Sequence, residues 1–268
     1  MTVTEDHATL QAAWQRWHDE RETMLREPHG WLSLTALEWL DETPRAIADL
    51  PGTWRAPGDG RVEITASVAD GIEVDGERVD GTRVVRPVDG EPGVLVSVGE
   101  RVVELARRTD SYALRVRDPH APTRAAFDGV PHFPVDARWV VTGRFEAYDA
   151  PRQITVGAVV DGLQHFPTAV GTVTFDVEGR EQHLVALAGK DGGLSLHFRD
   201  ATNGTTTYGG GRILRTDDPA PDGALVVDLN RAVNLPCAMT AFATCPLPPA
   251  GNVLDVAVEA GEKLLDAA

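Results

Sequence analysis

From residue 51 onward, short runs of β-branched residues alternate with turn signals. This pattern is the strongest constraint on which folds the chain can adopt. Asp-Gly pairs, such as those at 59–60, 75–76 and 222–223, separate many of the runs. This dipeptide supplies the positive backbone angles that tight hairpins need. Strand and helix patterns do not alternate, which disfavours a parallel sheet wound with helices. The sequence therefore predicts a mainly β protein with antiparallel sheets of the barrel or sandwich type. Strands are predicted at 61–65, 71–74, 82–86, 94–98, 101–107, 112–117, 138–148, 152–160, 172–178, 183–187, 194–199, 205–208, 212–215, 224–228 and 254–258.

The residues before this region have a helical pattern instead. Leu10, Trp14, Trp17, Met24 and Leu25 fall on one stripe of an α-helix, which predicts a helix over 5–27. Three leucines that share a face and a serine cap predict a second helix over 34–40. These two predicted helices are expected to cover one end of a sheet, and a partner-binding helix is the alternative.

The chain is expected to have an N-terminal helical segment at 1–50 and a first β-rich half at 51–117. A second β-rich half follows at 137–268. Between the halves, 118–136 is too rich in proline and turn residues to be a strand, but its phenylalanines indicate packing. It is predicted to be an ordered crossing segment. One continuous domain formed by both halves is the alternative.

Charge and composition exclude several functions. Among the 268 residues, 41 are acidic and 25 are Lys or Arg, which gives a net charge of −16. Nucleic acids and anionic membranes need a basic face, so neither is an expected partner. A small anionic ligand stays possible because it responds to the local field. The start of the chain has no secretory signal and no stretch is apolar enough to span a membrane, so we expect a cytoplasmic protein. Its oligomeric state is left open.

Motifs for common cofactors are missing from the sequence. It has no dinucleotide fingerprint, no complete phosphate loop and no Gly-x-Ser-x-Gly elbow. The histidines and the two cysteines show no metal-ligand spacing. We therefore predict no cofactor and no metal. A site gathered from His165, His183 and His197 on distant strands is the alternative, as is a flavin or metal protein.

Two clusters carry charged side chains in a pattern that suits a site. Arg115 and Arg117 lie on one strand face, followed by Asp118 and Arg124, and two guanidinium groups can hold a carboxylate or phosphate. A solvated ion-pair ladder is the alternative. Asp228 and Asn230 share a face at the end of an apolar strand. Asp228 is there either paired with an arginine or poised as an acid or base.

Two further segments suit a site through their backbone. Tyr208 and Arg212 flank three glycines, which let a ligand or another backbone approach closely. The stretch 234–252 is apolar but rich in proline, so its backbone must be satisfied by side chains such as Asn234 and Asn252. Packed irregular segments of this kind often line sites.

Several motifs, taken in order, resemble family 1684 of the domains of unknown function. They are WLSLTALEWL (31–40), RVRDPHAPTRAAFDGVPHFP (115–134), FRDATNGTTTYGGGRIL (198–214), VVDLNRAVNLPCAMTAFATCPLPPAGN (226–252) and AGEK (260–263). The resemblance covers nearly the whole chain. It implies a family of bacteria and archaea with no established activity. Similar proteins usually have Tyr and Pro where this chain has Val233 and Leu235, which implies a more apolar pocket here.

The resemblance also supplies the site candidates. The expected function is a cofactor-independent small-molecule enzyme that uses acid–base residues, of the hydrolase, isomerase or lyase type. A non-catalytic ligand-binding or scaffold protein is the alternative. The site is expected where 226–237, 208–212 and 115–124 converge. The candidate catalytic residues are Asp228, Tyr208, Arg212 and Cys237, and the candidate substrate-binding residues are Arg115, Asp118, Arg124, Asn230, Asn234, Cys245, Glu259 and Lys263.

Overall fold

A computed structural model describes residues 3–265 of the chain. Strands make up 42% of it and helices 15%, which confirms the prediction of a mainly β protein with an N-terminal helix. The chain divides into two compact units. Residues 24–127 form one, here called the inserted unit, and the described residues before and after them form the other, called the half-barrel unit. The predicted 1–50 segment is therefore shared between the two units.

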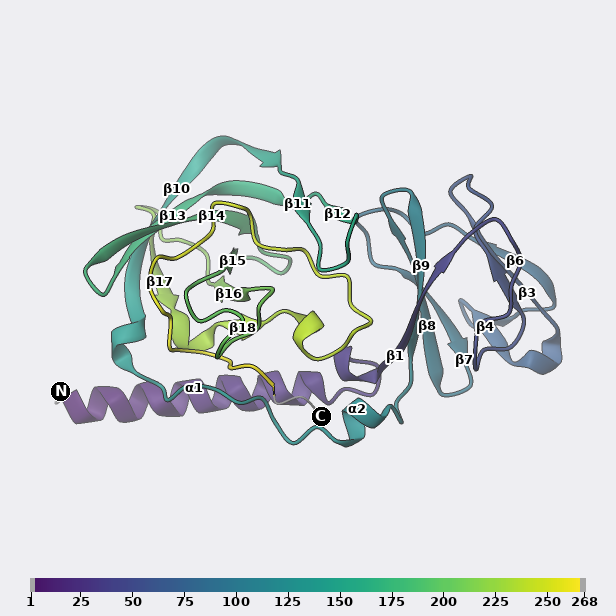
Figure 1. Ribbon diagram of the computed structural model, residues 1–268, viewed down its shortest axis with the longest axis horizontal. Helices are drawn as coiled ribbons and strands as arrows, with labels where there is room; N and C mark the ends of the chain where they lie inside the picture. Colours follow the sequence, from purple (N-terminus) through teal and green to yellow (C-terminus); the bar gives the residue numbers. More distant parts are fainter. Residues whose placement is uncertain (1–2, 266–268) are drawn as a thin grey trace. The chain divides into compact units, whose positions relative to one another are not determined.

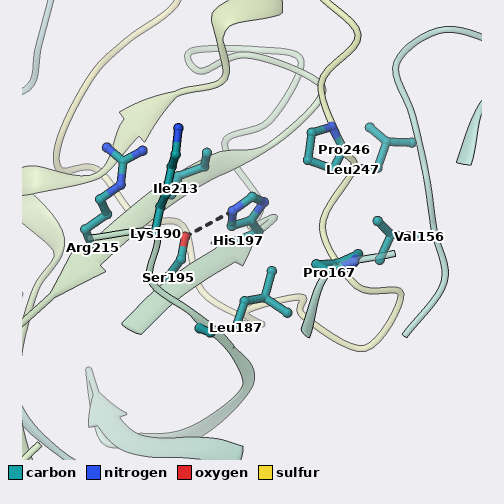
Figure 2. A pocket seen from close by; sticks show the side chains of 11 residues that line it. Val156, Pro167, Leu187, Lys190, Ser195, His197, Ile213, Arg215, Pro246 and Leu247 are labelled. Carbon is teal, nitrogen blue, oxygen red and sulfur yellow. Dashed lines mark hydrogen bonds between the residues drawn. The ribbon is translucent and has the colours of Figure 1, made fainter. Parts of the chain in front are cut away.

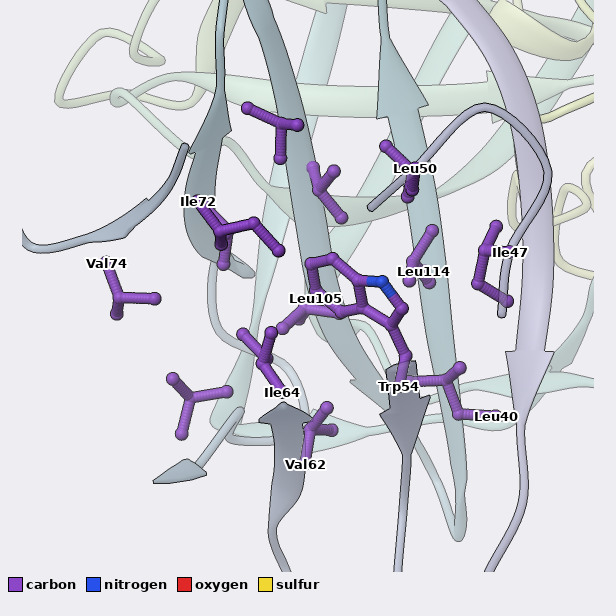
Figure 3. Close-up of a cluster of buried hydrophobic side chains, with 14 of the residues drawn as sticks. Leu40, Ile47, Leu50, Trp54, Val62, Ile64, Ile72, Val74, Leu105 and Leu114 are labelled. Carbon is purple, nitrogen blue, oxygen red and sulfur yellow. The ribbon is translucent and has the colours of Figure 1, made fainter. Parts of the chain in front are cut away.

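The inserted unit consists of two antiparallel sheets. Its strands are β1 (Leu34–Leu40), β2 (Thr53–Arg55), β3 (Val62–Ala66), β4 (Ile72–Val74), β5 (Glu77–Arg78), β6 (Gly81–Val85), β7 (Val94–Val98), β8 (Arg101–Arg108) and β9 (Ser111–Arg117), with one short helix, α2 (Pro122–Ala125). The sheets have the orders β1-β9-β8-β7-β4-β5 and β2-β3-β6. The indole of Trp54 is fully buried between them, among Ile64, Leu105 and Leu114 (Figure 3).

The prediction of a helix over 34–40 is wrong. These residues form β1, which pairs antiparallel with β9 over positions such as Leu37 and Arg115. A short apolar run fits both a helix stripe and a strand, and periodicity alone does not separate them. The long-range pairing with β9 decides between them, because it satisfies the β1 backbone.

The half-barrel unit contains a curled antiparallel sheet (Figure 1). Its strands are β10 (Val140–Gln153), β11 (Val156–Gly157), β12 (Gln164–His165), β13 (Thr168–Val177), β14 (Arg180–Ala188), β15 (Leu194–Phe198), β16 (Arg212–Thr216), β17 (Ala224–Asp228) and β18 (Val233–Asn234). Seven of them form the order β17-β10-β13-β14-β15-β16-β18, and β11 and β12 form a separate hairpin. The inner face of the sheet holds a core that includes Trp139, Phe198 and Val227.

The strand predicted at 254–258 does not form. Residues 252–262 are here called the strap, and as far as residue 260 they alternate between buried and exposed side chains as a strand does. Their backbone, however, bonds to loops and to buried side chains. For example, Leu254 N–H donates to the carbonyl of Arg199, and Glu262 N–H donates to the carbonyl of Ala232. The alternation therefore reports a packed, extended segment without a regular ladder.

Two other predicted strands also differ. Residues 205–208 form a tight turn in which three successive backbone N–H groups donate to the carbonyl oxygen of Thr202. Ser and Thr hydroxyl groups compete with a ladder for such backbone groups. The predicted strand 152–160 is divided between the end of β10 and the short β11.

The helix α1 (Val3–Leu25) confirms the predicted N-terminal helix. Within the half-barrel unit, its buried Trp14 donates from the indole N–H to the carbonyl of Asn230 at 2.8 Å. Arg21 pairs with Glu262 of the strap at 3.0 Å. Met24, which was predicted in the apolar stripe, is 54% exposed. Among the described residues, no helix combines the length and the apolar character needed to cross a membrane.

Candidate functional site

Arg212 on β16 lies in a fully buried ion pair. Its Nη2 is 2.7 Å from Oδ2 of Asp200, and neither side chain is exposed. The same guanidinium group donates to the carbonyl oxygens of Val258 and Ala260 in the strap. Asp200 also accepts from Thr202 and from the N–H of Val258. The pair therefore joins β16 to the strap, and most of its hydrogen-bonding capacity is used in doing so.

Asp228 and Asn230 cap and fasten a short turn after β17. Asp228 Oδ1 accepts from the backbone N–H and the side-chain amide of Asn230, at 3.1 and 2.9 Å. Its Oδ2 lies 3.1 Å from Nε of Arg231, a residue that is 36% exposed. Asn230 also exchanges two hydrogen bonds with the backbone of Asp136. The turn therefore holds Asp228 at its N-cap.

Residues around the end of the strap also form hydrogen bonds that involve the backbone. Asn234 donates to the carbonyl of Lys263, and its own N–H donates to the buried carboxylate of Glu262 at 2.6 Å. The Lys263 ammonium group lies over the ring of Phe133. Glu259 is exposed. Asn234 and Lys263 thus lie together, whereas Glu259 points to solvent.

The two cysteines lie side by side in the irregular segment after β18. The N–H of Cys237 donates to Sγ of Cys245 at 3.2 Å, and the N–H of Cys245 donates to Sγ of Cys237 at 3.4 Å. Burial, and then the two nearby cysteine sulfurs, raise the pKa of Tyr208 to about 12. The phenol is consequently protonated at neutral pH and suits a donor rather than a base.

The remaining candidates belong to the inserted unit. Arg115 and Arg117 both bind Glu104, at 2.6 and 2.7 Å, in a buried cluster. The carboxylate of Asp118 accepts from the backbone two residues further on. Arg124 donates to backbone carbonyl groups of the same unit. These groups bind partners within their unit, and their convergence with 208–237 stays a prediction.

A cavity of about 260 Å³ opens on the outer face of the half-barrel sheet. The hairpin β11–β12 contributes Val156 to it, and the segment after Cys245 contributes Pro246 and Leu247. Figure 2 shows Arg215 and Lys190 on one side and Val156 and Pro167 on the other, with Ser195 and His197 between them. The complete lining is Val156, Pro167, Leu187, Ala188, Lys190, Ser195, His197, Ile213, Arg215, Pro246 and Leu247.

The alternation of side chains along β15 builds the floor of this cavity. Leu194, Leu196 and Phe198 enter the core, so Ser195 and His197 point to the opposite face. Ser195 pairs with Leu187 of β14 on one side and with Arg215 of β16 on the other. Directly opposite residues have Cβ atoms about 4.5–5.5 Å apart, which places Arg215 beside Ser195.

His197 is the most perturbed titratable group in the cavity. Burial, and then the positive charge of Arg215, lower the pKa of His197 to about 4, so its ring is neutral at pH 7. Ser195 Oγ lies 3.1 Å from Nε2 of His197 (Figure 2). The other ring nitrogen, Nδ1, is buried without a hydrogen-bond partner among the described residues. A buried polar atom of this kind costs free energy unless a ligand or water satisfies it.

Sequence reasoning missed most of this cavity. It named His197 only as a possible metal ligand and did not name Ser195 or Arg215. The one available signal was the alternation of apolar and polar residues at 194–198, which also fits an ordinary half-exposed strand. Within the described residues, no cluster of three or more His, Cys, Asp or Glu side chains could hold a metal ion.

Comparison with known proteins identifies the family of this chain. The model of the family described as "Protein of unknown function (DUF1684)" matches residues 125–263, which is more than half of the chain. The chain belongs to this family. The match leaves out the motif at 31–40 and the whole of the first arginine cluster at 115–124. It includes the cavity floor, the Arg212–Asp200 pair and the strap.

A solved structure of another protein is similar to about half of this chain. It is the solution NMR structure of an uncharacterized protein from Haloarcula marismortui, 33% identical, and the alignment covers 52% of this chain and 78% of that one with a TM-score of 0.44. No curated protein matches the chain.

Proposed function

We propose that the half-barrel unit binds a small organic anion with an apolar part in the cavity beside Ser195 and His197. The observation that carries this proposal is the arrangement of the lining. Arg215 and Lys190 are exposed on one side, while Val156 and Leu247 form an apolar wall. A carboxylate bound at Arg215 would place its hydrocarbon chain against that wall.

The local charge of the cavity supports an anionic ligand. The whole chain carries 41 acidic and 25 basic residues, yet none of the eleven lining side chains is acidic. A ligand of this size responds to the field of its immediate surroundings more than to the net charge. Lys190 and Arg215 therefore make this region attractive to an anion on an acidic protein.

The volume supports a small ligand. At about 260 Å³, the cavity lies just below the usual range of about 300–1,000 Å³ for ligand pockets. Within this proposal, His197 is the acid–base group of the predicted small-molecule site. Asp228 and Arg212 instead hold the backbone around it.

Titration calorimetry with butanoate, hexanoate and octanoate tests the proposal. Burying one methylene group is worth about 0.8 kcal/mol, so we expect affinity to rise about fourfold per methylene until the cavity is full. Neutral hexanamide should bind at least tenfold more weakly than hexanoate. Arg215→Met should remove this preference, whereas Arg144→Met, at a 70% exposed position on β10, should not. Equal affinities for hexanoate and hexanamide, or no binding of either, would overturn the proposal.

A further inference from the structure

We propose that Ser195 is a nucleophile with His197 as its base, and that the cavity hydrolyses small carboxylic esters of apolar acids. This inference rests on the proposed function, because the carboxylate product of such a reaction is the anion that the cavity binds. It adds a reaction and assigns a role to each polar side chain between the charged and apolar sides.

The geometry of β15 supports the nucleophile–base pair. Ser195 and His197 are two residues apart, so both side chains leave the same face of the strand. The distance of 3.1 Å from Ser195 Oγ to His197 Nε2 is within the reach expected of a nucleophile and its base. Because β15 is paired on both sides, the strand holds the two groups in fixed register.

The histidine is unprotonated at pH 7, which leaves a ring nitrogen able to accept a proton, and its low pKa makes it a weak base. The imidazole is neutral at pH 7, so Nε2 is able to accept a proton from the serine hydroxyl group in the tautomer with its hydrogen on Nδ1. In that tautomer Nδ1 is a buried donor, and no described residue accepts from it.

The proposed reaction balances without a cofactor. Ser195 Oγ attacks the ester carbonyl carbon, and the hydroxyl proton moves to Nε2 of His197. The bond from carbon to the alcohol oxygen then breaks, and the imidazolium returns the proton to the leaving alcohol. Water attacks the resulting acyl-serine with His197 again accepting a proton, which passes back to Ser195 Oγ. The products are the alcohol and the carboxylic acid.

Arg215 supplies the positive charge that this reaction needs. Negative charge develops on the carbonyl oxygen during both attacks, and a fixed cation beside that oxygen stabilises it. Arg215 is paired directly with Ser195 across β15 and β16. The same guanidinium group would then bind the carboxylate product, which joins the reaction to the anion preference of the cavity.

An alkyl p-nitrophenyl phosphonate tests the nucleophile directly. A serine activated in this way displaces p-nitrophenolate and keeps the phosphonyl group, which peptide mass spectrometry locates. We expect a single adduct on Ser195, none in Ser195→Ala, and modification at least 100-fold slower in His197→Gln. Ser97→Ala, an exposed serine of the inserted unit, should react as the unchanged protein does. Thermal melts of each variant show whether the fold is kept.

The pH dependence separates a base from a merely structural histidine. Arg215 of β16 and Lys190 of the β14–β15 connection are the charged groups that line the cavity with His197. The modification rate should be level from pH 8 to 5 and fall by half near pH 4. Absence of the adduct in protein that still binds hexanoate would overturn the nucleophile and leave the proposed function standing. Absence of both would overturn both.

Discussion

Two polar pairs lie on opposite faces of the sheet around β15 and β16, and they differ in what they bond to. Asp200 and Arg212 lie on the inner side and bond to each other, to neighbouring hydroxyl and amide groups and to strap carbonyls. Ser195 and His197 lie on the outer side and bond to each other, while Nδ1 of His197 has no partner in the described chain. Each pair leaves one buried nitrogen without a partner in the described chain, Nε of Arg212 in the first and Nδ1 of His197 in the second, but only the first pair bonds to other segments of the protein.

The two pairs therefore differ in role: one holds backbone segments together, and the other is the candidate for chemistry. The quoted motifs include Asp200, Arg212, Asn230 and Asn252, all of which hydrogen-bond to backbone groups of other segments. Such residues are needed wherever a packed segment lacks a ladder, since buried backbone groups must find partners. The outer-face pair has no such duty. Variants on the two faces should therefore differ in stability and in ligand binding.

The largest expected effect comes from the inner pair. Asp200→Ala removes the carboxylate that forms the buried ion pair with Arg212, so this buried charge loses its direct partner. We expect the free energy of unfolding, measured with urea, to fall by about 3–5 kcal/mol. Glu146→Ala, at a 72% exposed position on β10, is the matched control and should change little. A loss no larger than that of the control would show that the two faces are equivalent.

His197 should make stability depend on pH. In the unfolded chain it titrates near 6.5, whereas in the folded protein burial and Arg215 lower its pKa to about 4. Between these values the unfolded state binds a proton that the folded state does not. Stability should therefore fall as pH drops from 6.5 to 4, by roughly 3 kcal/mol in total, and no further below that. His197→Gln should flatten this part of a stability–pH curve; an unchanged slope would contradict the burial of a neutral ring.

A substitution at Asn252 tests whether hydrogen bonds hold the strap against the sheet. The Asn252 side chain bonds to the N–H and carbonyl of Val185 and to the carbonyl of His197, where the strap lies against β14 and β15. Asn252→Ala leaves these buried groups without their partner, which should lower the free energy of unfolding by about 2–3 kcal/mol. Val253→Ala, at the neighbouring 57% exposed position, should cost much less. Comparable losses in the two variants would mean that the strap is held by its apolar contacts alone.

Asp228→Asn should have the smallest effect. The carboxylate caps a turn, and its ion-pair partner Arg231 is 36% exposed, so the interaction is weakened by solvent. Asn is as good an N-cap as Asp, so only the ion pair is lost, and we expect a loss of less than about 1 kcal/mol in a thermal or urea titration. Hexanoate affinity should not change. If the variant instead kept full stability and lost ligand binding, Asp228 would belong to the site and the proposed cavity would not be the whole of it.

The sequence predicted the fold class well because turns and alternation are local signals. Asp-Gly pairs and β-branched runs placed strands such as β8, β9 and β13 within a few residues. It did not place β1 as a strand, because only pairing with β9 distinguishes that run from a helix. The strap was read as a strand for a related reason, since the alternation in its sequence reports which side chains are buried and not what the backbone bonds to.

The candidate site was harder to predict from the chain. Charged and polar residues in motifs attract attention, yet Arg212 and Asn230 are consumed by backbone contacts that come from distant segments. Ser195 and His197 are unremarkable in sequence. They become a candidate site only because the β11–β12 hairpin and the segment at 246–247 lie over that face of the sheet. No local sequence pattern predicts that these distant segments cover this face of the sheet.

The division of the chain sets an order of events during synthesis. The inserted unit is continuous, whereas the half-barrel unit needs residues from before and after it. Trp14 and its partner Asn230 are 216 positions apart. At about 5–20 residues per second, a ribosome takes about 10–40 s to make the chain between them. Throughout that interval the indole N–H of Trp14 lacks the carbonyl group that it bonds to in the folded unit, so the helix is made long before this contact is able to form.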